Sequence, residues 1–495
     1  MLLQIELIYF IVMIGVFVAL MIGAKLPSGL CLMASSLIGM IMSAIFSKTA
    51  FEFRYLVEGA FGYFDTILTI TTAMIFMGAL QITGALEYIS AVIVKIFRKW
   101  PTILLIAFMI IIMFPAMVTG SSLASAISAG ALVAPIMIKW GIPKAKTGAI
   151  VAMGSILGMV APPVNVPAMV ICDVVDIPYT NFTLPLLLLV LPVAIISVII
   201  LGRKYVKPIE EDEVGKVVSV DILKELNGTV AIPLYILIAL IIGEMIWPKI
   251  LGSFAMPGMF VVATISSFFF GRKIPFFKKH EEGEEKDESG EEKPNCVVDV
   301  VRQGVLKSFG AMGLLMGVGM FMEVIALNGV RSYFVANALM LPDFWKYVSM
   351  ALTLPIFGGI SAFGSASVLG GPFVMSMYTA RTSITLTCGF SLMAAIGEFL
   401  PPTAMSATFA SSMVGEKKWS VISKAALPAI LAVYVFGLVY IILFAKIIFD
   451  EVFPSSEVGY LVLLAICIIL AISFAIIYGF ILKIKDKKTN AKEAE

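Results

Sequence analysis

The chain has 495 residues, of which 60% are hydrophobic and only 14% are charged. Soluble domains carry about a quarter charged residues, so this composition excludes an ordinary soluble protein and indicates a polytopic membrane protein. The formal net charge of +2 identifies no partner, and no nucleic-acid ligand is expected. The single histidine, His280, lies in a charged segment, and the five cysteines are scattered without metal-type or redox spacing.

Apolar runs that approach the length needed to cross a bilayer follow one another along the chain. In the first half they cover residues 7–23, 30–46, 66–80, 102–118, 122–137, 149–172 and 184–201. In the second half they cover residues 230–246, 258–270, 309–326, 348–358, 368–378, 384–409, 425–444 and 459–482. None alternates polar and apolar residues as the strands of a membrane barrel do, so all are expected to be helices.

Two pairs of runs are too short, or too polar at one end, to be ordinary spans. The first pair covers residues 102–137 and the second covers residues 348–378, and each pair is joined by a tip rich in glycine and serine. We interpret each pair as a re-entrant hairpin that enters and leaves the membrane on one side. About eleven transmembrane helices remain beside the two hairpins.

Basic residues favour one orientation of these spans. With the N-terminus outside and the C-terminus in the cytoplasm, 28 of the 35 basic residues face the cytoplasm. The protein is therefore expected to be a multi-pass protein of the cytoplasmic (inner) membrane. A connector at residues 204–229, an acidic loop at 271–304 and a tail at 483–495 would all be cytoplasmic.

Similar short motifs of glycine, tyrosine and proline occur in the same order in the two halves, residues 1–203 and 230–482. The stretch ITGALEYI at 82–89 parallels LNGVRSYF at 327–334, and each half later has a glycine four residues before a Pro-Pro pair. On the orientation above, the first hairpin opens to the cytoplasm and the second opens outward. Such inverted repeats are typical of secondary transporters, whose sites lie near the membrane midplane where discontinuous helices meet.

Each Pro-Pro pair interrupts a long apolar run, at 149–172 and at 384–409. Proline removes a backbone donor and clashes with the preceding turn, so the helix must open, and its freed carbonyls must line a cavity or bind a cation. The hairpin tips precede half-helices, whose N-termini attract anions. The predicted substrate- or ion-binding residues lie at these tips and breaks: Gly120, Ser121, Ser122, Pro162, Pro163, Asn165, Gly364, Ser365, Ser367, Glu398, Pro401, Pro402 and Thr403.

Several polar residues also have a plain structural explanation. Small residues let helices approach closely, and Ser125, Ser128 and Gly130 are expected to do only that. Asn165 and Thr403 could instead cap the restarted helices. Glu398, inside an apolar run, is a functional candidate that could bind sodium, carry a proton or hold the break. The sodium candidates are Gly120, Ser122, Asn165, Gly364, Ser365 and Glu398.

At these residues the sequence resembles the ion transporter superfamily, and within it the large membrane subunit of TRAP transporters, the DctM-like permeases. The resemblance rests on GSSLASAISAGALVAPIMIKWGIPKAKTGAIVAMGSILGMVAPPVNVPAMVI, which looks like that family's first hairpin and broken helix. It is good over about residues 74–203 and looser afterward, where GGISAFGSASVLGGPF departs from the family pattern. Carried over, the ion sites would fall at 120–122 and 162–165, with repeat equivalents at 364–367 and 398–403.

The resemblance also implies a mechanism and partners. It implies an elevator in which a transport domain, made of the hairpins and broken helices, slides against a scaffold. It implies coupling to sodium, an organic-anion substrate such as a C4-dicarboxylate, and no other cofactor. A small four-helix membrane subunit and an extracytoplasmic binding protein would be separate chains, unless this member works alone.

The leading hypothesis is therefore a sodium-coupled carrier of an organic anion. A sodium/proton antiporter is the alternative, because related folds exchange these ions and Glu398 could carry the proton. A channel would instead show flux that ignores any coupling gradient. No enzyme is expected, because the sequence has no H-E-x-x-H motif, no paired intramembrane aspartates and no usable histidine.

Overall fold

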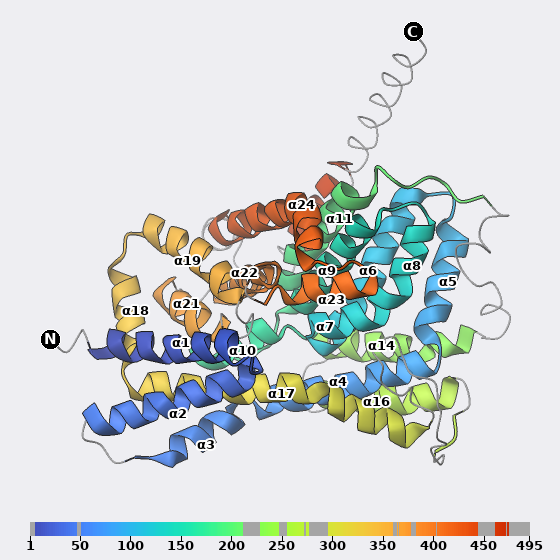
Figure 1. Ribbon diagram of the computed structural model, residues 1–495. Coiled ribbons are helices and arrows are strands. Elements are labelled where there is room, and N and C mark those ends of the chain that lie inside the picture. The colour runs from blue at the N-terminus through green and yellow to red at the C-terminus, as the bar shows by residue number, and fades with distance from the viewer. Residues whose placement is uncertain are drawn as a thin grey trace, which may run out of the picture.

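The computed structural model describes residues 5–46, 51–210, 228–246, 255–271, 274–276, 296–359, 364, 366–377, 383–401, 403–443, 461–471 and 473–474. Regular structure in these residues is helical throughout, without a strand (Figure 1). Eight of the described helices are long and apolar enough to cross a membrane. The predicted all-α polytopic membrane fold is thereby confirmed.

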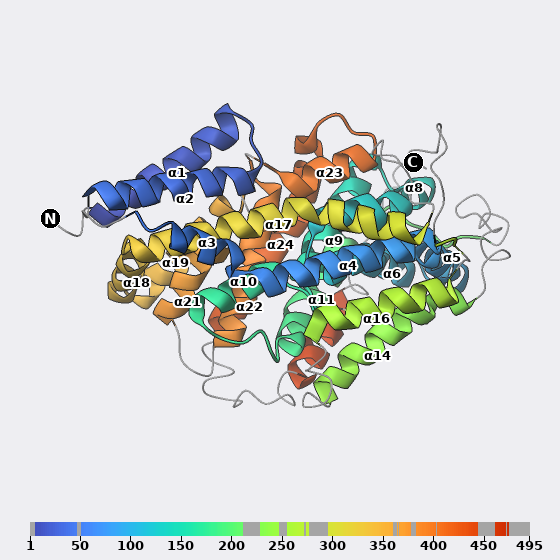
Figure 2. The same ribbon diagram turned by 90° about the horizontal axis from the view of Figure 1, so that it is seen from below.

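The longest described helix forms the spine of one helix group. This helix, α17 (Val297–Leu327), packs against α2 (Ser28–Phe46), α3 (Phe53–Gly62) and α4 (Phe64–Ile82). Figure 2 shows α17 and α4 running side by side, with α1 (Ile5–Gly23) beyond α2. The four N-terminal helices and α17 thus form one packed layer, which we call the arm layer.

Glycines let the helices of the arm layer touch backbone to backbone. A Cβ added at Gly29 would lie 2.4 Å from the Gly313 carbonyl oxygen, and one added at Gly59 would lie 2.5 Å from that of Gly319. Such approach is typical of membrane helices, where close van der Waals packing replaces the hydrophobic effect as the driving force.

A valine at Gly319 is expected to separate α3 from α17. The Cβ at Gly319 would lie 1.9 Å from the Gly59 carbonyl oxygen, so the helices must move apart, at a cost of roughly 1–3 kcal/mol or more. The thermal unfolding temperature of the purified Gly319→Val variant should fall clearly. The matched control is Gly313→Ala on the same helix, where the added Cβ meets nothing within 4 Å. Equal unfolding temperatures for the two variants would contradict the packing.

From α4 onward the helices occur in two series that repeat each other in order. In the first half, a hairpin returns through the short helix α7 (Ser122–Ser125), the π-helix η2 (Ala126–Gly130) and α8 (Ala131–Lys139). In the second half, the hairpin returns through the π-helix η6 (Ala366–Gly370) and α21 (Gly371–Met377). The other equivalent pairs are α4 with α17, α5 (Ala85–Phe97) with α18 (Val330–Met340), α6 (Pro101–Thr119) with α19 (Asp343–Gly358), α9 (Lys144–Val160) with α22 (Ser383–Ile396), α10 (Val166–Val175) with α23 (Met405–Met413), and α11 (Thr183–Gly202) with α24 (Trp419–Val439).

The glycines that suggested the repeat have the same backbone role in both halves. Gly84 precedes α5 with φ 78°, and Gly329 precedes α18 with φ 73°. Side chains other than glycine rarely adopt this left-handed conformation, so both of these turns between helices favour glycine. The matching glycines in the two halves therefore mark the same kind of turn.

Equivalent helices run in opposite directions. The end of α4 lies at the start of α17, because a Cβ at Gly78 or at Gly304 would contact Val300 or Ile75 respectively. The Tyr440 hydroxyl, just past α24, donates to the Pro185 carbonyl near the start of α11 at 3.1 Å. Both pairs are antiparallel, as the predicted inverted repeats require.

Some element boundaries differ from the sequence expectation. Helix α17 begins at Val297, whereas the apolar run begins at 309 and the acidic loop was expected to extend to 304. The reason is composition: residues 297–308 include Asp299, Arg302, Gln303 and Lys307, which end an apolar run without ending a helix. Three more helices, α3, α5 and α18, fall outside the predicted runs because charged residues such as Arg54, Glu87 and Arg331 interrupt their apolar residues.

The remaining described helices match predicted runs. They are the 3₁₀ turn η4 (Gly228–Ala231), α14 (Ile232–Ile246), α16 (Ala255–Phe270) and the helix Leu461–Ala471. Helix α16 packs on both α14 and α4 and so extends the arm layer sideways (Figure 2). Most of the acidic loop, and the tail at 483–495, lie outside the described residues.

Candidate functional site

The first hairpin turns at Gly120, between α6 and α7. Gly120 ends α6 with φ 63°, and the Ser121 hydroxyl caps α7 by accepting a hydrogen bond from the Ala124 N–H at 3.3 Å. A Cβ at Gly120 would lie 2.4 Å from Val166 Cγ2, so the tip is pressed against the chain beyond the first Pro-Pro pair. Glycine is needed here both for the turn and for the close approach.

The first broken helix consists of α9 and α10, which are separated by residues 161–165. Pro162 and Pro163 are buried and joined by a cis peptide bond. The Val164 N–H donates to the Met117 carbonyl oxygen of α6 at 3.2 Å. The hairpin tip therefore ends beside the middle of the broken helix, as a re-entrant hairpin does.

Asn165 joins the first break to the opposite repeat. Its side-chain oxygen accepts from the Ala168 N–H at 3.0 Å, which makes it the cap of α10. Its side-chain amide donates to the Val160 carbonyl at 2.9 Å and to the Ser391 hydroxyl of α22 at 2.8 Å. The capping explanation is thus confirmed for Asn165, and its amide also ties the break to α22.

Tyr179, which follows α10 in the chain, forms hydrogen bonds that stabilise the first break. Its hydroxyl accepts from the Asn165 N–H at 3.2 Å and donates to the Pro163 carbonyl at 3.2 Å, while its ring stacks on Phe182 with centroids 4.7 Å apart. The hydroxyl satisfies two of the backbone groups that the break frees from helical bonding.

Tyr179→Phe is expected to loosen the first break while keeping the ring packing. Loss of both hydrogen bonds should lower the free energy of unfolding by about 1–3 kcal/mol, because two buried backbone groups lose their partner. The measurement is the thermal unfolding temperature of the purified variant. Tyr235→Phe serves as the control, since Tyr235 is 64% exposed on α14 and its change should have no effect. An unchanged unfolding temperature for Tyr179→Phe would show that the hydroxyl does not hold the break.

The second broken helix consists of α22 and α23, joined by the 3₁₀ turn η7 (Gly397–Phe399) and residues 400–404. Pro401 is exposed, unlike the buried prolines of the first break. The Thr403 hydroxyl donates to the Gly359 carbonyl at the end of α19, at 2.6 Å. The capping alternative is therefore wrong for Thr403: α23 is preceded by Ala404 in the left-handed region, without a side-chain cap.

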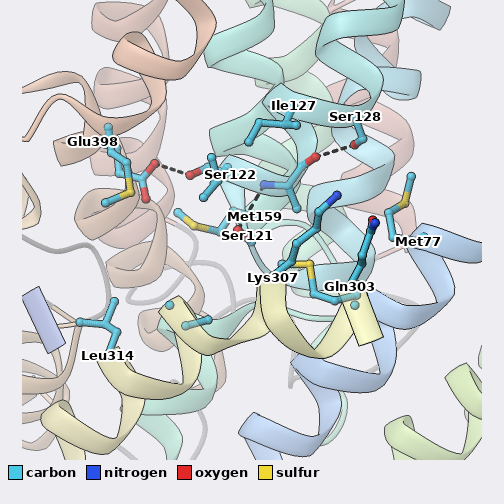
Figure 3. Close-up of a pocket in the computed structure, with 18 of the residues that line it drawn as sticks. Met77, Ser121, Ser122, Ile127, Ser128, Met159, Gln303, Lys307, Leu314 and Glu398 are labelled. Carbon is cyan, nitrogen blue, oxygen red and sulfur yellow. Dashed lines mark hydrogen bonds between the residues drawn. The ribbon is translucent and has the colours of Figure 1, made fainter. Parts of the chain in front are cut away.

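Glu398 in η7 is the polar centre of the site. The residue is 5% exposed, and its Oε2 accepts a hydrogen bond from the Ser122 hydroxyl at 2.6 Å (Figure 3). The same oxygen accepts a second hydrogen bond from the Ser406 hydroxyl of α23. Ser122 belongs to the first hairpin and Ser406 to the second broken helix. Because both hydroxyls donate to the same oxygen, this carboxyl group connects the two repeats.

A cavity of about 510 Å³ opens beside this contact. One wall is the first hairpin tip and the second break, including Ser121, Ser122 and Glu398. The opposite wall is the arm layer, from which Gln303 and Lys307 of α17 point toward the hairpin (Figure 3). Its volume is within the range of about 300–1,000 Å³ that is typical of small-molecule sites.

The structure brings five of the thirteen predicted site residues to this region. Gly120, Ser121, Ser122 and Glu398 meet around the tip of the first hairpin, with Thr403 also on the cavity wall. Asn165 and the first prolines lie behind the tip and do not line the cavity. In the second hairpin, Gly364 is buried and Ser367 belongs to η6, whereas Ser365 and Pro402 lie outside the described residues.

The packing role expected for the small residues of the returning arm holds for two of the three. The Ser125 hydroxyl donates to the Ile112 carbonyl, and a Cβ at Gly130 would lie 2.7 Å from Val151 Cγ1. Ser128 differs, because it lines the cavity while its hydroxyl donates to the Ala124 carbonyl within its own helix.

Sequence reasoning missed several residues that the structure places at the site. Ser406 and Ser391 are ordinary serines in their helices, and nothing local distinguishes them. Gln303 and Lys307 carried a signal that was available: both interrupt the approach to an apolar run four residues apart, which places them on one helix face.

The fold and the site together define a class of protein. Inverted repeats whose broken helices meet a hairpin tip beside a polar cavity are typical of secondary membrane transporters. The family model described as "Tripartite ATP-independent periplasmic transporter, DctM component" matches residues 14–447. The chain therefore belongs to the DctM family, the large membrane components of TRAP transporters, as the resemblance of the first hairpin predicted. No curated protein sequence matches the chain significantly.

Membership of the DctM family defines the general activity of the chain. DctM proteins are components of secondary transporters of organic anions, and they work with a DctQ subunit and a DctP-type binding protein. This chain is accordingly a multi-pass membrane transporter component.

Proposed function

We propose that this chain moves a small organic carboxylate across the cytoplasmic membrane, coupled to sodium, by an elevator movement of one helix group against another. The observation that carries the proposal is the position of the cavity. It lies between the arm layer and the group formed by the first hairpin and the second break, with a buried carboxylate on its wall. A substrate held there touches both groups.

The packing of α17 supports an elevator. Within the arm layer its contacts with α2 and α3 are made through glycine backbones, which form a rigid unit. Toward the first hairpin tip, by contrast, α17 faces a cavity. A group of helices that moves needs a boundary that is not tightly packed. Two arrangements of the helices can then exchange at a moderate cost in free energy.

The oxygen atoms around Glu398 and the first break support sodium as the coupling ion. The Ser122 and Ser406 hydroxyls converge on the carboxylate, and the break exposes carbonyls such as that of Pro163 to side-chain donors. Hard cations prefer oxygen ligands of these kinds. The proposed ion ligands remain Gly120, Ser122, Asn165, Gly364, Ser365 and Glu398, together with Ser406.

The proposed partners and orientation follow the family. A DctQ-type subunit would pack on exposed apolar helices, and a DctP-type protein would deliver the carboxylate from outside. We propose the inner membrane as the location, with the N-terminus outside and the C-terminus in the cytoplasm, from the distribution of basic residues.

Uptake into proteoliposomes tests the proposed function. The full chain is reconstituted alone, and also with its DctQ and DctP partners, and labelled carboxylates are supplied with and without an inward sodium gradient. Uptake that requires the sodium gradient supports the proposal. Sodium/proton exchange without any carboxylate would favour the antiporter, and carboxylate flux that ignores every ion gradient would contradict the coupling.

A further inference from the structure

Charged side chains gather where the end of α10 faces the arm layer, beside which α10 lies in both views of the molecule (Figure 1, Figure 2). Asp173 of α10 is exposed and lies within electrostatic range of Asp65, in the first turn of α4. Tyr63, just before α4, is in range of Asp173 and of Glu323 on α17. It is also in range of Arg331 on α18. These three carboxyl groups and the guanidinium form what we call the charged boundary.

The carboxyl groups of the charged boundary belong to different helix groups. Asp173 is part of the first broken helix, whereas Asp65 and Glu323 are part of the arm layer. Negative charges on the two sides repel each other, so they oppose a close approach of α10 to the arm layer. Helix α10 packs mainly on α22, η6 and α21. Its distance from the arm layer is therefore sensitive to the balance of charge between them.

Arg331 supplies the positive charge of the charged boundary. Its helix, α18, follows α17 through the left-handed turn at Gly329 and packs on α21, so it links the arm layer to the second hairpin. The guanidinium donates to the Val174 carbonyl at the end of α10 and lies 3.7 Å from Met375 Sδ of α21. Both contacts are with uncharged atoms, so its charge acts on the surrounding carboxyl groups together rather than on one ion-pair partner.

The first repeat has an uncharged residue at the position equivalent to Arg331. Arg331 lies two residues after Gly329, and the residue two after Gly84 is Leu86, which is buried. Because α5 and α18 follow the same kind of turn, a helix at this place in the fold does not need an arginine to form. The guanidinium therefore serves a feature that differs between the repeats, and the charged boundary is such a feature.

We propose that Arg331 is a positioning residue that keeps α10 close to the arm layer by offsetting the carboxyl groups of the charged boundary. It thereby stabilises one of the arrangements between which the two helix groups exchange. This inference rests on the proposed elevator movement, and it adds a controlling residue that does not line the cavity. Without the guanidinium, the repulsion is no longer offset, so the population shifts toward arrangements in which α10 lies farther from the arm layer.

The distance between α10 and the arm layer can be measured without transport. Spin labels are attached to Phe51→Cys, before α3, and Thr180→Cys, after α10, because both residues are exposed. Cys467→Ser removes the native cysteine that is partly exposed, and the other native cysteines are buried. Distances are recorded by pulsed electron paramagnetic resonance on the purified full-length chain at about pH 8, where carboxyl groups are ionised. The chain with its native charges should give one dominant distance and a minor longer one.

Restoring the balance of charge is the decisive comparison. Arg331→Gln should raise the population of the longer distance at least about threefold, since the repulsion is no longer offset. Adding Asp173→Asn should return that population to its original level, because two acids without a base have the same net charge as three acids with one. Adding Glu416→Gln instead, beyond α23, is the matched control and should not restore it.

A structural role for Arg331 predicts a different result. If Arg331 only satisfied the Val174 carbonyl, Asp173→Asn could not compensate for its loss, and failure to restore the dominant distance would overturn the proposal. Should Arg331→Gln fail to fold, Asp173→Asn alone decides, because it should lower the longer population about threefold. An unchanged distribution in that variant would also overturn the proposal. Absence of sodium-driven uptake by the unmodified protein would instead overturn the proposed function, whatever the distances show.

Discussion

Glu398→Gln is expected to fold normally and to lose sodium-driven uptake by about 10- to 100-fold. Both serine hydroxyls donate to the same carboxylate oxygen, Oε2. The amide oxygen of glutamine can accept both of these hydrogen bonds, so the connection between Ser122 and Ser406 survives. What disappears is the negative charge, which a coupling cation needs and which simple packing does not.

The measurement is uptake of a labelled carboxylate into proteoliposomes under a sodium gradient, together with the unfolding temperature. Glu398→Ala, made alongside, removes both the charge and the acceptor and should lower uptake and stability together. Glu416→Gln is the matched control, because it neutralises a carboxylate beyond α23 that does not line the cavity. Full uptake by Glu398→Gln would mean that Glu398 only holds the second break.

The parts of the fold that depend on local chemistry were predictable from the sequence. Two adjacent prolines cannot continue a helix, so the break at Pro162-Pro163 follows from residue type alone. Gly84 and Gly329 similarly mark turns that need a left-handed residue, which is why the repeat could be detected from a few identities. The helix break and the family follow from such signals, whereas the short helices α3, α5 and α18 do not.

Contacts between distant parts of the chain were not predictable. Ser122 and Glu398 are 276 residues apart and belong to different repeats, and each was a candidate for its own separate reason. Ser406 was missed because a serine in a helix carries no local mark of its partner. Only the packing of α23 against the first hairpin gives it a role.

The arm layer shows a limit of apolar patterning. A search for apolar runs places the start of α17 near residue 309, because polar side chains in the preceding turns lower the mean hydropathy. Those same side chains, Gln303 and Lys307, then face the cavity. A search for apolar runs therefore passes over polar residues that line a cavity, because it rejects the polarity that such a cavity contains.

Removing both serine donors should damage the protein more than removing the carboxylate as well. In the double variant Ser122→Ala, Ser406→Ala, the Glu398 carboxylate stays buried without its two hydroxyl partners. An unsatisfied buried charge of this kind should lower the free energy of unfolding by about 3 kcal/mol. Adding Glu398→Met, which has a similar length and no charge, should restore most of that stability, because the cluster then has no polar group to satisfy.

Sodium-driven uptake and stability should not change in parallel between the double and the triple variant. The triple variant should be nearly as stable as the unmodified protein and yet inactive in sodium-driven uptake, because the carboxylate and both hydroxyls are the proposed ion ligands. Thermal unfolding and uptake are measured on the same preparations, with Ser90→Ala, Ser412→Ala as a control whose hydroxyls do not contact Glu398 and do not line the cavity. A double variant as stable as this control would mean that the carboxylate finds other partners. A triple variant with normal uptake would move the coupling site away from Glu398 altogether.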